Sequence, residues 1–219
     1  MAAFDLPSRT IVNKVIPKNA FDSFTTSKQK KRFTDLLERI RWVNKLSAET
    51  INLTGKDIKE IQVFEIELKV QEDISDLIDI INKAIPYPII FYISFQDKAY
   101  LCASKKHPHP VNENVSVVDW TFASKWKTKS KINYELNLKQ NLDFIYHDFC
   151  LQLSSKYFKT NSIEDLVALE QKRTELNRKI LNTKASISRS KQYNKKVELN
   201  IELQKLEVDL KKLLDDNHH

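Results

Sequence analysis

Apolar and polar residues alternate along the middle of the chain with the two-residue period of β-strands. The clearest stretch runs from Glu60 to Val70, where Glu65, Glu67 and Lys69 alternate with apolar neighbours. Residues 89–95 are almost wholly apolar, which predicts a central strand that is covered on both faces. Two more strands are predicted after it, at residues 99–104 and 115–126.

Other stretches repeat apolar residues every three or four positions, as amphipathic helices do. We predict helices over residues 27–46, 73–84 and 137–157. Residues 105–114 are polar and contain prolines, so they predict a loop. Hairpin strands mixed with these helices predict an α+β domain over residues 1–160, in which a mostly antiparallel sheet is flanked by helices.

The pattern changes over residues 161–219, which predict a separate helical tail. A first apolar stripe comprises Leu166, Leu169, Leu176, Ile180 and Ile187. A second follows the strict four-three spacing of a coiled-coil seam and comprises Leu199, Leu203, Leu206, Leu210 and Leu213. The two stripes are out of register, so the tail is either an antiparallel helical hairpin or one long helix with a stutter.

The second stripe predicts a binding surface, because its five leucines must be buried against another apolar surface. Three partners fit the pattern: the first helix of the same tail, a second copy of the chain in a homodimer, or a foreign protein. The spacing alone does not distinguish them.

Glycine use excludes several enzyme classes. The chain has one glycine, Gly55, whereas phosphate-binding loops and dinucleotide fingerprints need several at fixed spacing. Cys102 and Cys150 are expected to be reduced core thiols. Residues 1–7 lack the features of a secretory signal, and no apolar run approaches the length of about 20 residues that spans a bilayer. We therefore expect a cytoplasmic protein with no membrane contact.

Positive charge is concentrated in one part of the predicted domain. Between residues 98 and 139 there are eight lysines and three acidic residues. Lysines neutralise phosphates and aromatic rings stack on bases, so this segment predicts contact with DNA or RNA. The alternative is that the lysines protect an edge strand from pairing with other sheets. The candidate nucleic-acid-binding residues are Lys105, Lys106, Lys125, Trp126, Lys127, Lys129 and Lys131.

An alternative catalytic site lies on the predicted strand at 60–70. Glu65, Glu67 and Lys69 project to one face, and Glu67 with Lys69 matches part of a metal-dependent nuclease motif. Such a site needs a further acidic ligand for Mg²⁺, for which Asp57 is the nearby candidate. The simpler interpretation is the solvated face of an amphipathic strand. No other metal site is predicted.

Four phrases together resemble the bacterial domain-of-unknown-function family 4391. They are RWVNKLSAETINL (residues 41–53), EIQVFEIELK (60–69), INKAIPYPIIF (81–91) and KQYNKKVELN (191–200). The resemblance covers about residues 6–213. It implies a setting in restriction and phage-defence gene clusters, beside helicase and methyltransferase genes, and it supplies no catalytic residues.

These patterns favour a non-enzymatic accessory subunit of a bacterial DNA-directed defence system. The tail would bind a protein partner such as a helicase or methyltransferase subunit, and the lysines would contact nucleic acid. No cofactor is expected for this function. The alternative is an Mg²⁺-dependent nuclease built on Asp57, Glu65, Glu67 and Lys69.

Overall fold

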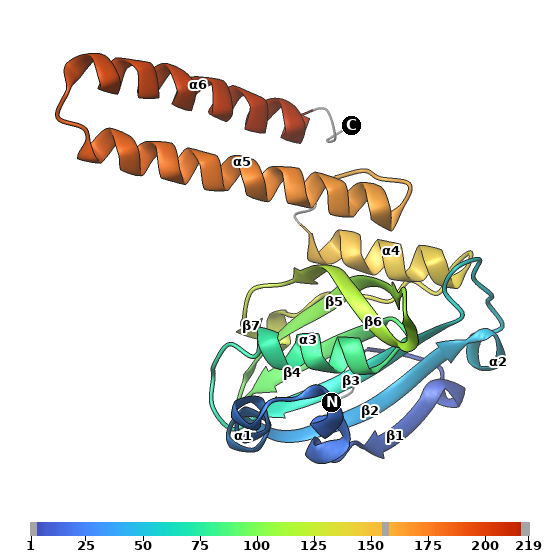
Figure 1. Cartoon of the computed structure of the whole chain (residues 1–219). Coiled ribbons are helices and arrows are strands. Elements are labelled where there is room, and N and C mark those ends of the chain that lie inside the picture. Colours follow the sequence, from blue (N-terminus) through green and yellow to red (C-terminus); the bar gives the residue numbers. More distant parts are fainter. Residues whose placement is uncertain (1–3, 155–157, 216–219) are drawn as a thin grey trace. The chain divides into compact units, whose positions relative to one another are not determined.

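The computed structural model describes residues 4–154 and 158–215, which fall into two compact units (Figure 1). The first unit ends at Leu153 and the second begins at Ser154. Among the described helices, none combines the length and the apolar character needed to cross a membrane.

A seven-stranded mixed sheet forms the centre of the first unit. Its neighbours follow the order β1-β2-β3-β4-β5-β6, and β7 pairs with β5. Among the described strands only β3 and β4 are parallel neighbours, and the other pairs are antiparallel. The fold is therefore α+β with a mostly antiparallel sheet, as predicted. The strands are β1 (Ile11–Val15), β2 (Leu37–Ser47), β3 (Glu60–Leu68), β4 (Ile89–Phe95), β5 (Lys98–His109), β6 (Asn112–Ala123) and β7 (Lys127–Thr128).

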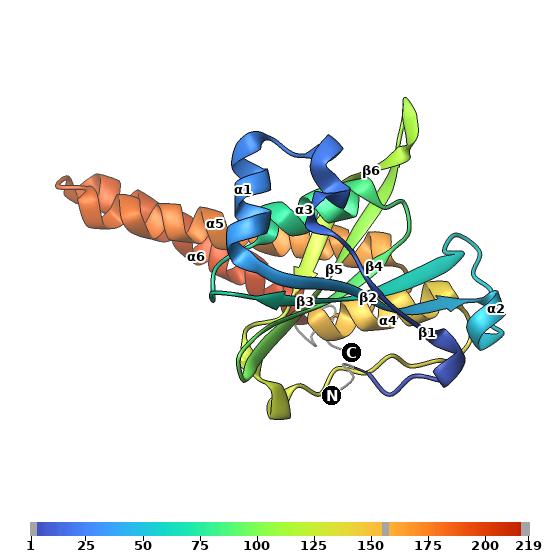
Figure 2. The same ribbon diagram turned by 90° about the horizontal axis from the view of Figure 1, so that it is seen from below.

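Helices cover both faces of this sheet, and Figure 2 shows α1 and α3 on one face and α4 on the other. The helix α3 connects the parallel strands β3 and β4. The four α-helices of this unit are α1 (Ser27–Leu36), α2 (Ala48–Ile51), α3 (Ser75–Ala84) and α4 (Leu142–Leu153). Three short 3₁₀ turns are η1 (Ser8–Thr10), η2 (Lys18–Phe24) and η3 (Lys129–Lys131).

The main core lies between the sheet and the helices α1 and α3. Phe64 of β3 and Phe91 of β4 are fully buried there, with ring centroids 6.1 Å apart in an edge-on arrangement. The helix α3 adds Leu77, Ile78 and Ile81, which recur at the three- and four-residue spacing of its inner face. This packing fixes α3 over the middle of the sheet and so positions its first turn.

The predicted helix at 27–46 is wrong in its second half. The helix α1 begins at a capping box, in which Thr26 Oγ1 accepts from Gln29 N, and it ends at Leu36. The chain then continues directly into β2, which lies between β1 and β3. Pairing with strands on both sides satisfies the backbone hydrogen-bonding groups of β2. This outweighs the apolar spacing of residues 37–46, which fits a helix as well as a strand.

The predicted loop at 105–114 is also wrong, because β5 and β6 extend through it as a long hairpin. Proline is tolerated where a strand needs no ladder donor, and a register shift lies at Pro108/His109. Near the start of this extension, the Tyr146 hydroxyl of α4 bonds to the backbone of Ser104 as a neighbouring strand would. It accepts from Ser104 N at 3.1 Å and donates to Ser104 O at 2.9 Å.

The loop between α2 and β3 wraps around the carboxylate of Asp143, in the first turn of α4. The backbone N–H groups of Lys56, Asp57 and Ile58 donate to its two oxygens at 2.6, 3.1 and 2.9 Å. A Cβ at Gly55 would stand 2.1 Å from the carbonyl oxygen of Ile58 and 2.8 Å from Asp143 Oδ2. The single glycine therefore stands where the loop has no room for a side chain.

The second unit contains two long helices, α5 (Ile163–Arg189) and α6 (Tyr193–Asp215), which form an antiparallel hairpin (Figure 1). Ser162 caps α5, since its Oγ accepts from Asp165 N at 3.1 Å. Lys184 of α5 pairs with Glu207 of α6 at 2.9 Å. Of the two predicted tail structures, the hairpin is the one that forms.

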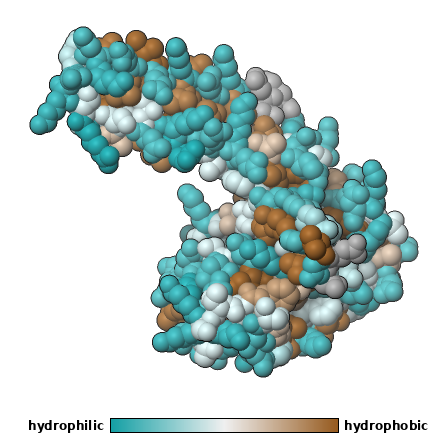
Figure 3. All heavy atoms as spheres, viewed as in Figure 1, coloured by the Kyte–Doolittle hydropathy of each residue, from teal (hydrophilic) through white to brown (hydrophobic). Residues whose placement is uncertain are grey.

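The predicted leucine seam lies on the side of α6 that faces α5. Its members Leu199, Leu203, Leu206, Leu210 and Leu213 are half-buried or buried. Figure 3 shows apolar side chains gathered along the line where the two helices meet. On the opposite side of α6, Val197, Ile201 and Val208 remain 41–51% exposed. The first helix of the tail therefore covers the seam in part.

Candidate functional site

The short strand β7 gathers the later lysines at one end of β5. In the register, Lys98 is opposite Thr128 and Ala99 is opposite Lys127. The backbone N–H of Lys129 donates to Asp97 O at 2.7 Å, which holds η3 against the turn between β4 and β5. Four exposed lysines share this region, and we call them the lysine edge: Lys98, Lys125, Lys129 and Lys131.

Lys127, a member of the predicted set, is turned onto an aromatic ring instead. Its Nζ lies 4.9 Å from the centroid of Tyr134 and donates to the Tyr134 hydroxyl at 3.4 Å. Its side chain is half-buried. Lys127 is therefore engaged within the unit, and the lysine edge excludes it.

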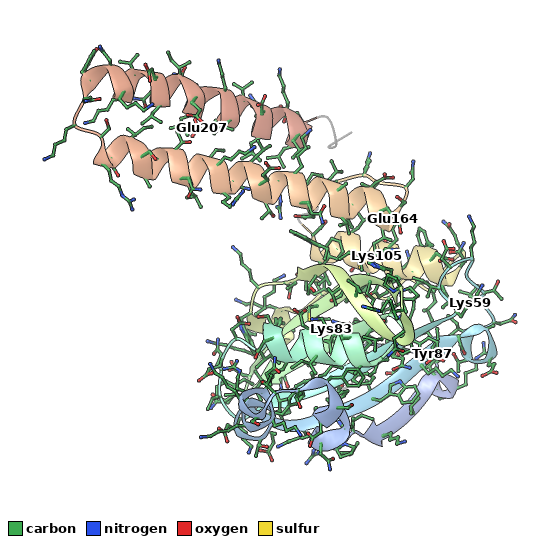
Figure 4. The ribbon with its side chains drawn as sticks, in the orientation of Figure 1. Lys59, Lys83, Tyr87, Lys105, Glu164 and Glu207 are labelled. Carbon is green, nitrogen blue, oxygen red and sulfur yellow. The ribbon has the colours of Figure 1, made fainter. Side chains whose placement is uncertain are left out.

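Lys105 and Lys106 lie far from the lysine edge on the same strand. Seven positions separate Lys98 from Lys105, which is roughly 24 Å at about 3.4 Å per residue. Lys105, which is labelled in Figure 4, is opposite Trp120 in the register. Both residues are half-buried. All these lysines and Trp126 were expected on one surface, whereas the structure puts Lys98 at the start of β5 and Lys105 and Lys106 in its second half.

Lys106 caps the C-terminal end of α3. Its Nζ donates to the carbonyl oxygens of Asn82 and Ile85 at 2.9 and 2.6 Å. These carbonyls have no partner within the helix, so the amine fills a structural role. Burial lowers the pKa of Lys106 to about 7. A neutral amine still carries two N–H donors, one for each carbonyl, so deprotonation costs neither hydrogen bond.

This lowered pKa makes the protein more stable as the pH rises above neutral. Between pH 7 and about 10 the unfolded chain keeps the lysine proton that the folded chain has lost, so the free energy of unfolding increases with pH. In urea titrations at pH 6.5 and pH 9, we expect the wild-type increase to exceed that of Lys106→Met by about 2–3 kcal/mol, because the folded and unfolded chains differ by one proton over about two pH units. Equal increases in the two proteins would show that Lys106 keeps its ordinary pKa in the fold.

A cavity of about 380 Å³ opens beside the lysine edge, between the start of α3, the first half of β5 and the end of β6. Its aromatic wall consists of Tyr100 and Trp126, whose ring centroids lie 4.7 Å apart with planes inclined by 62°. Two rings at this angle form a corner in which a flat ligand can stack on one ring and touch the edge of the other. Lys125 lines the same cavity.

Another part of the cavity lining is polar and acidic, and its Glu72 carboxylate lies 4.0 Å from Arg32 Nη1. Glu72 and Asp73 line the cavity just before the first residue of α3, together with Ser75. Asp73 is held in place because its carboxylate accepts from Ser75 N at 2.9 Å and from Ser75 Oγ at 3.1 Å. Arg32 Nη2 donates to the Asp73 carbonyl at 2.8 Å, which anchors the same segment from α1.

The Tyr100 hydroxyl and the Cys102 thiol in the cavity lining are neutral at physiological pH. Burial, followed by the nearby Cys102 and Asp73, raises the pKa of the Tyr100 hydroxyl. Burial and then Asp79 raise the pKa of the Cys102 thiol, so this thiol stays protonated and is a poor nucleophile. The cavity therefore offers stacking surface and hydrogen-bonding groups, which suits binding more than covalent chemistry.

The residues of the alternative nuclease site are not brought together. Asp57 precedes β3, whereas Glu67 and Lys69 lie at its other end, and the strand between them spans roughly 24 Å. Glu65 forms an ion pair with Arg41, and Lys69 Nζ donates to Thr34 O at 2.9 Å. Among the described residues there is no cluster of three or more acidic, histidine or cysteine side chains that could hold a metal.

Four residues of the site, Lys98, Tyr100, Glu72 and Asp73, were not predicted from the sequence. One signal was available, because Lys98 and Tyr100 are two positions apart on one strand and so share a face. The other half of the cavity comes from the β3–α3 connection, and only the folded sheet brings it to β5.

Comparison with known proteins places the chain in a family. No curated protein and no solved structure matches it. A family model matches residues 4–210, which include nearly all of both units and confirm the resemblance of the four phrases. The chain therefore belongs to the family described as a domain of unknown function (DUF4391).

Proposed function

We propose that this protein is a non-enzymatic accessory subunit that binds single-stranded nucleic acid through the lysine edge. The observation that carries the proposal is that the pairing of β5 with β7 brings the segment of Lys125, Lys129 and Lys131 to Lys98, next to a cavity that Lys125, Trp126 and Tyr100 line. Basic side chains next to recessed aromatic rings are the pattern of single-strand binding sites, since lysines follow the backbone while rings stack on bases.

The recessed position of the rings favours a single strand over a duplex. Trp126 is half-buried and packs against the core, so it cannot reach into the stacked interior of a double helix. Unpaired bases can leave the strand and enter a cavity, whereas paired bases must first be opened. The cavity also lies at the β3–α3 connection, which follows the carboxyl end of β3.

The proposal of a protein partner does not depend on the lysine edge or the cavity. A helicase or methyltransferase subunit in a DNA-directed defence system is suggested by the family resemblance alone. The exposed apolar residues of the second unit that such a partner would contact include Leu181, Tyr193, Val197, Ile201 and Val208. Co-purification from the native operon is the measurement that bears on this part.

Fluorescence anisotropy with a labelled single strand tests the nucleic-acid part. With an oligonucleotide of about 20 residues at about 50 mM salt, we expect a Kd of about 1–100 μM. The logarithm of the binding constant should fall with the logarithm of salt concentration with a slope of about −2 to −3, because about four lysines contact phosphates. The absence of any anisotropy rise at about 50 mM salt, where phosphate contacts are strong, would overturn the proposal.

A further inference from the structure

We infer that the cavity receives one unstacked base that carries an exocyclic amino group, such as cytosine or adenine. This inference rests on the proposed function and identifies the ligand of the cavity within it. The volume of about 380 Å³ lies at the lower end of the range for ligand pockets, which suits a single base with part of its sugar.

The shape of the aromatic wall determines how a base would lie. Trp126 and Tyr100 meet at 62°, so a planar ring stacked on one of them has its edge directed toward the other. Ile78 and Cys102 complete an apolar floor beneath this corner. A base seated there presents its hydrogen-bonding edge to the remaining side of the cavity, where Glu72 and Asp73 lie.

The chemistry of that side selects the base. Ionised carboxylates only accept hydrogen bonds, and a carboxylate has about four acceptor positions. Ser75 occupies two positions on Asp73, which leaves capacity for a further donor. The amino group of cytosine or adenine donates, whereas the corresponding carbonyl of uracil or thymine would face the carboxylates with its own lone pairs.

The phosphates of the same nucleotide would meet the lysine edge. Lys98 shares the Tyr100 face of β5 and lies two residues away, about 7 Å along the strand. Lys125 lines the cavity next to Trp126. In this arrangement the base contacts Glu72 and Asp73, and its phosphates contact the lysine edge.

A comparison of oligo(dC) with oligo(dU) tests this inference, because cytosine carries an amino group at C4 beside an unprotonated N3, whereas uracil carries a carbonyl at C4 beside an N3–H. We expect the wild-type protein to bind oligo(dC) about 10-fold more tightly. The double variant Asp73→Asn/Glu72→Gln should reduce this ratio to less than about 2-fold, without weakening oligo(dU). The matched control Asp57→Asn/Glu67→Gln removes two exposed carboxylates outside the cavity and should keep the ratio.

Tryptophan fluorescence gives a second readout. Oligo(dC) should quench the wild-type emission by stacking on Trp126, and Trp126→Phe should remove that change while Trp42 and Trp120 still emit. Salt-sensitive binding with equal affinity for both oligonucleotides and no Trp126 quenching would overturn the inference and leave the proposed function intact. Failure to bind either oligonucleotide would overturn the proposed function, and the inference with it.

Discussion

The substitution Gly55→Ala in the α2–β3 loop is expected to lower the free energy of unfolding of the first unit substantially. The added Cβ would stand 2.1 Å from the Ile58 carbonyl oxygen, a backbone atom that cannot rotate away. The loop must open, and the three N–H groups that bind Asp143 then lose their geometry. We expect a loss of about 3 kcal/mol, or a fall in Tm of roughly 6–12 °C.

Thermal unfolding followed by circular dichroism measures this effect. Lys56→Ala is the matched control, because it changes an exposed side chain in the same loop and keeps the backbone N–H that binds Asp143. Its stability should stay within about 0.5 kcal/mol of wild type. A Tm for Gly55→Ala equal to that of Lys56→Ala would mean that the loop has room the structure does not show.

The parts of the fold that depend on local periodicity were predictable. The strand at 89–95 matches β4, and the helix at 73–84 differs from α3 by two residues at its start. The break between the two tail stripes predicted a hairpin as one of two alternatives, because a turn can reset the register of a heptad pattern. In each case the buried face is defined by residues close together in the sequence.

The errors occur where distant residues decide the structure. Residues 37–46 carry apolar spacing that fits a helix, but β2 is stabilised by β1 and β3 on its two sides, which the pattern of one segment does not report. The extended β5–β6 hairpin is supported by cross-strand pairs up to His109 and Asn112. Prolines and polar residues indicated a loop there, and strand pairing prevailed.

The candidate site also combines features that the local sequence predicts with features that depend on distant residues. Composition identified the lysine-rich segment and Trp126, because these are properties of the sequence itself. The assignment of each lysine depended on the fold: Lys106 reaches the end of α3, Lys127 lies on Tyr134, and Lys98 joins the surface through the pairing of β5 with β7. The cavity combines three distant segments, so no local motif could have predicted it.

Reversing three charges of the lysine edge is expected to remove most of the binding to single-stranded nucleic acid. In Lys125→Glu/Lys129→Glu/Lys131→Glu, three phosphate contacts are lost and three repulsive charges replace them. The slope of the salt dependence should shrink by about 2, at about 0.7 per contact, and the affinity at about 50 mM salt should fall at least about 100-fold. Anisotropy titrations over a range of salt concentrations measure both quantities.

The control for this variant must have the same net charge, because any loss of positive charge weakens binding to a polyanion. Lys14→Glu/Lys28→Glu/Lys31→Glu changes three exposed lysines of β1 and α1 and alters the total charge equally. If binding depends on where the lysines lie, this control should lose less than about 5-fold and keep its salt slope. Equal losses in the two variants would show that overall charge, and not the surface organised by β7, attracts the nucleic acid.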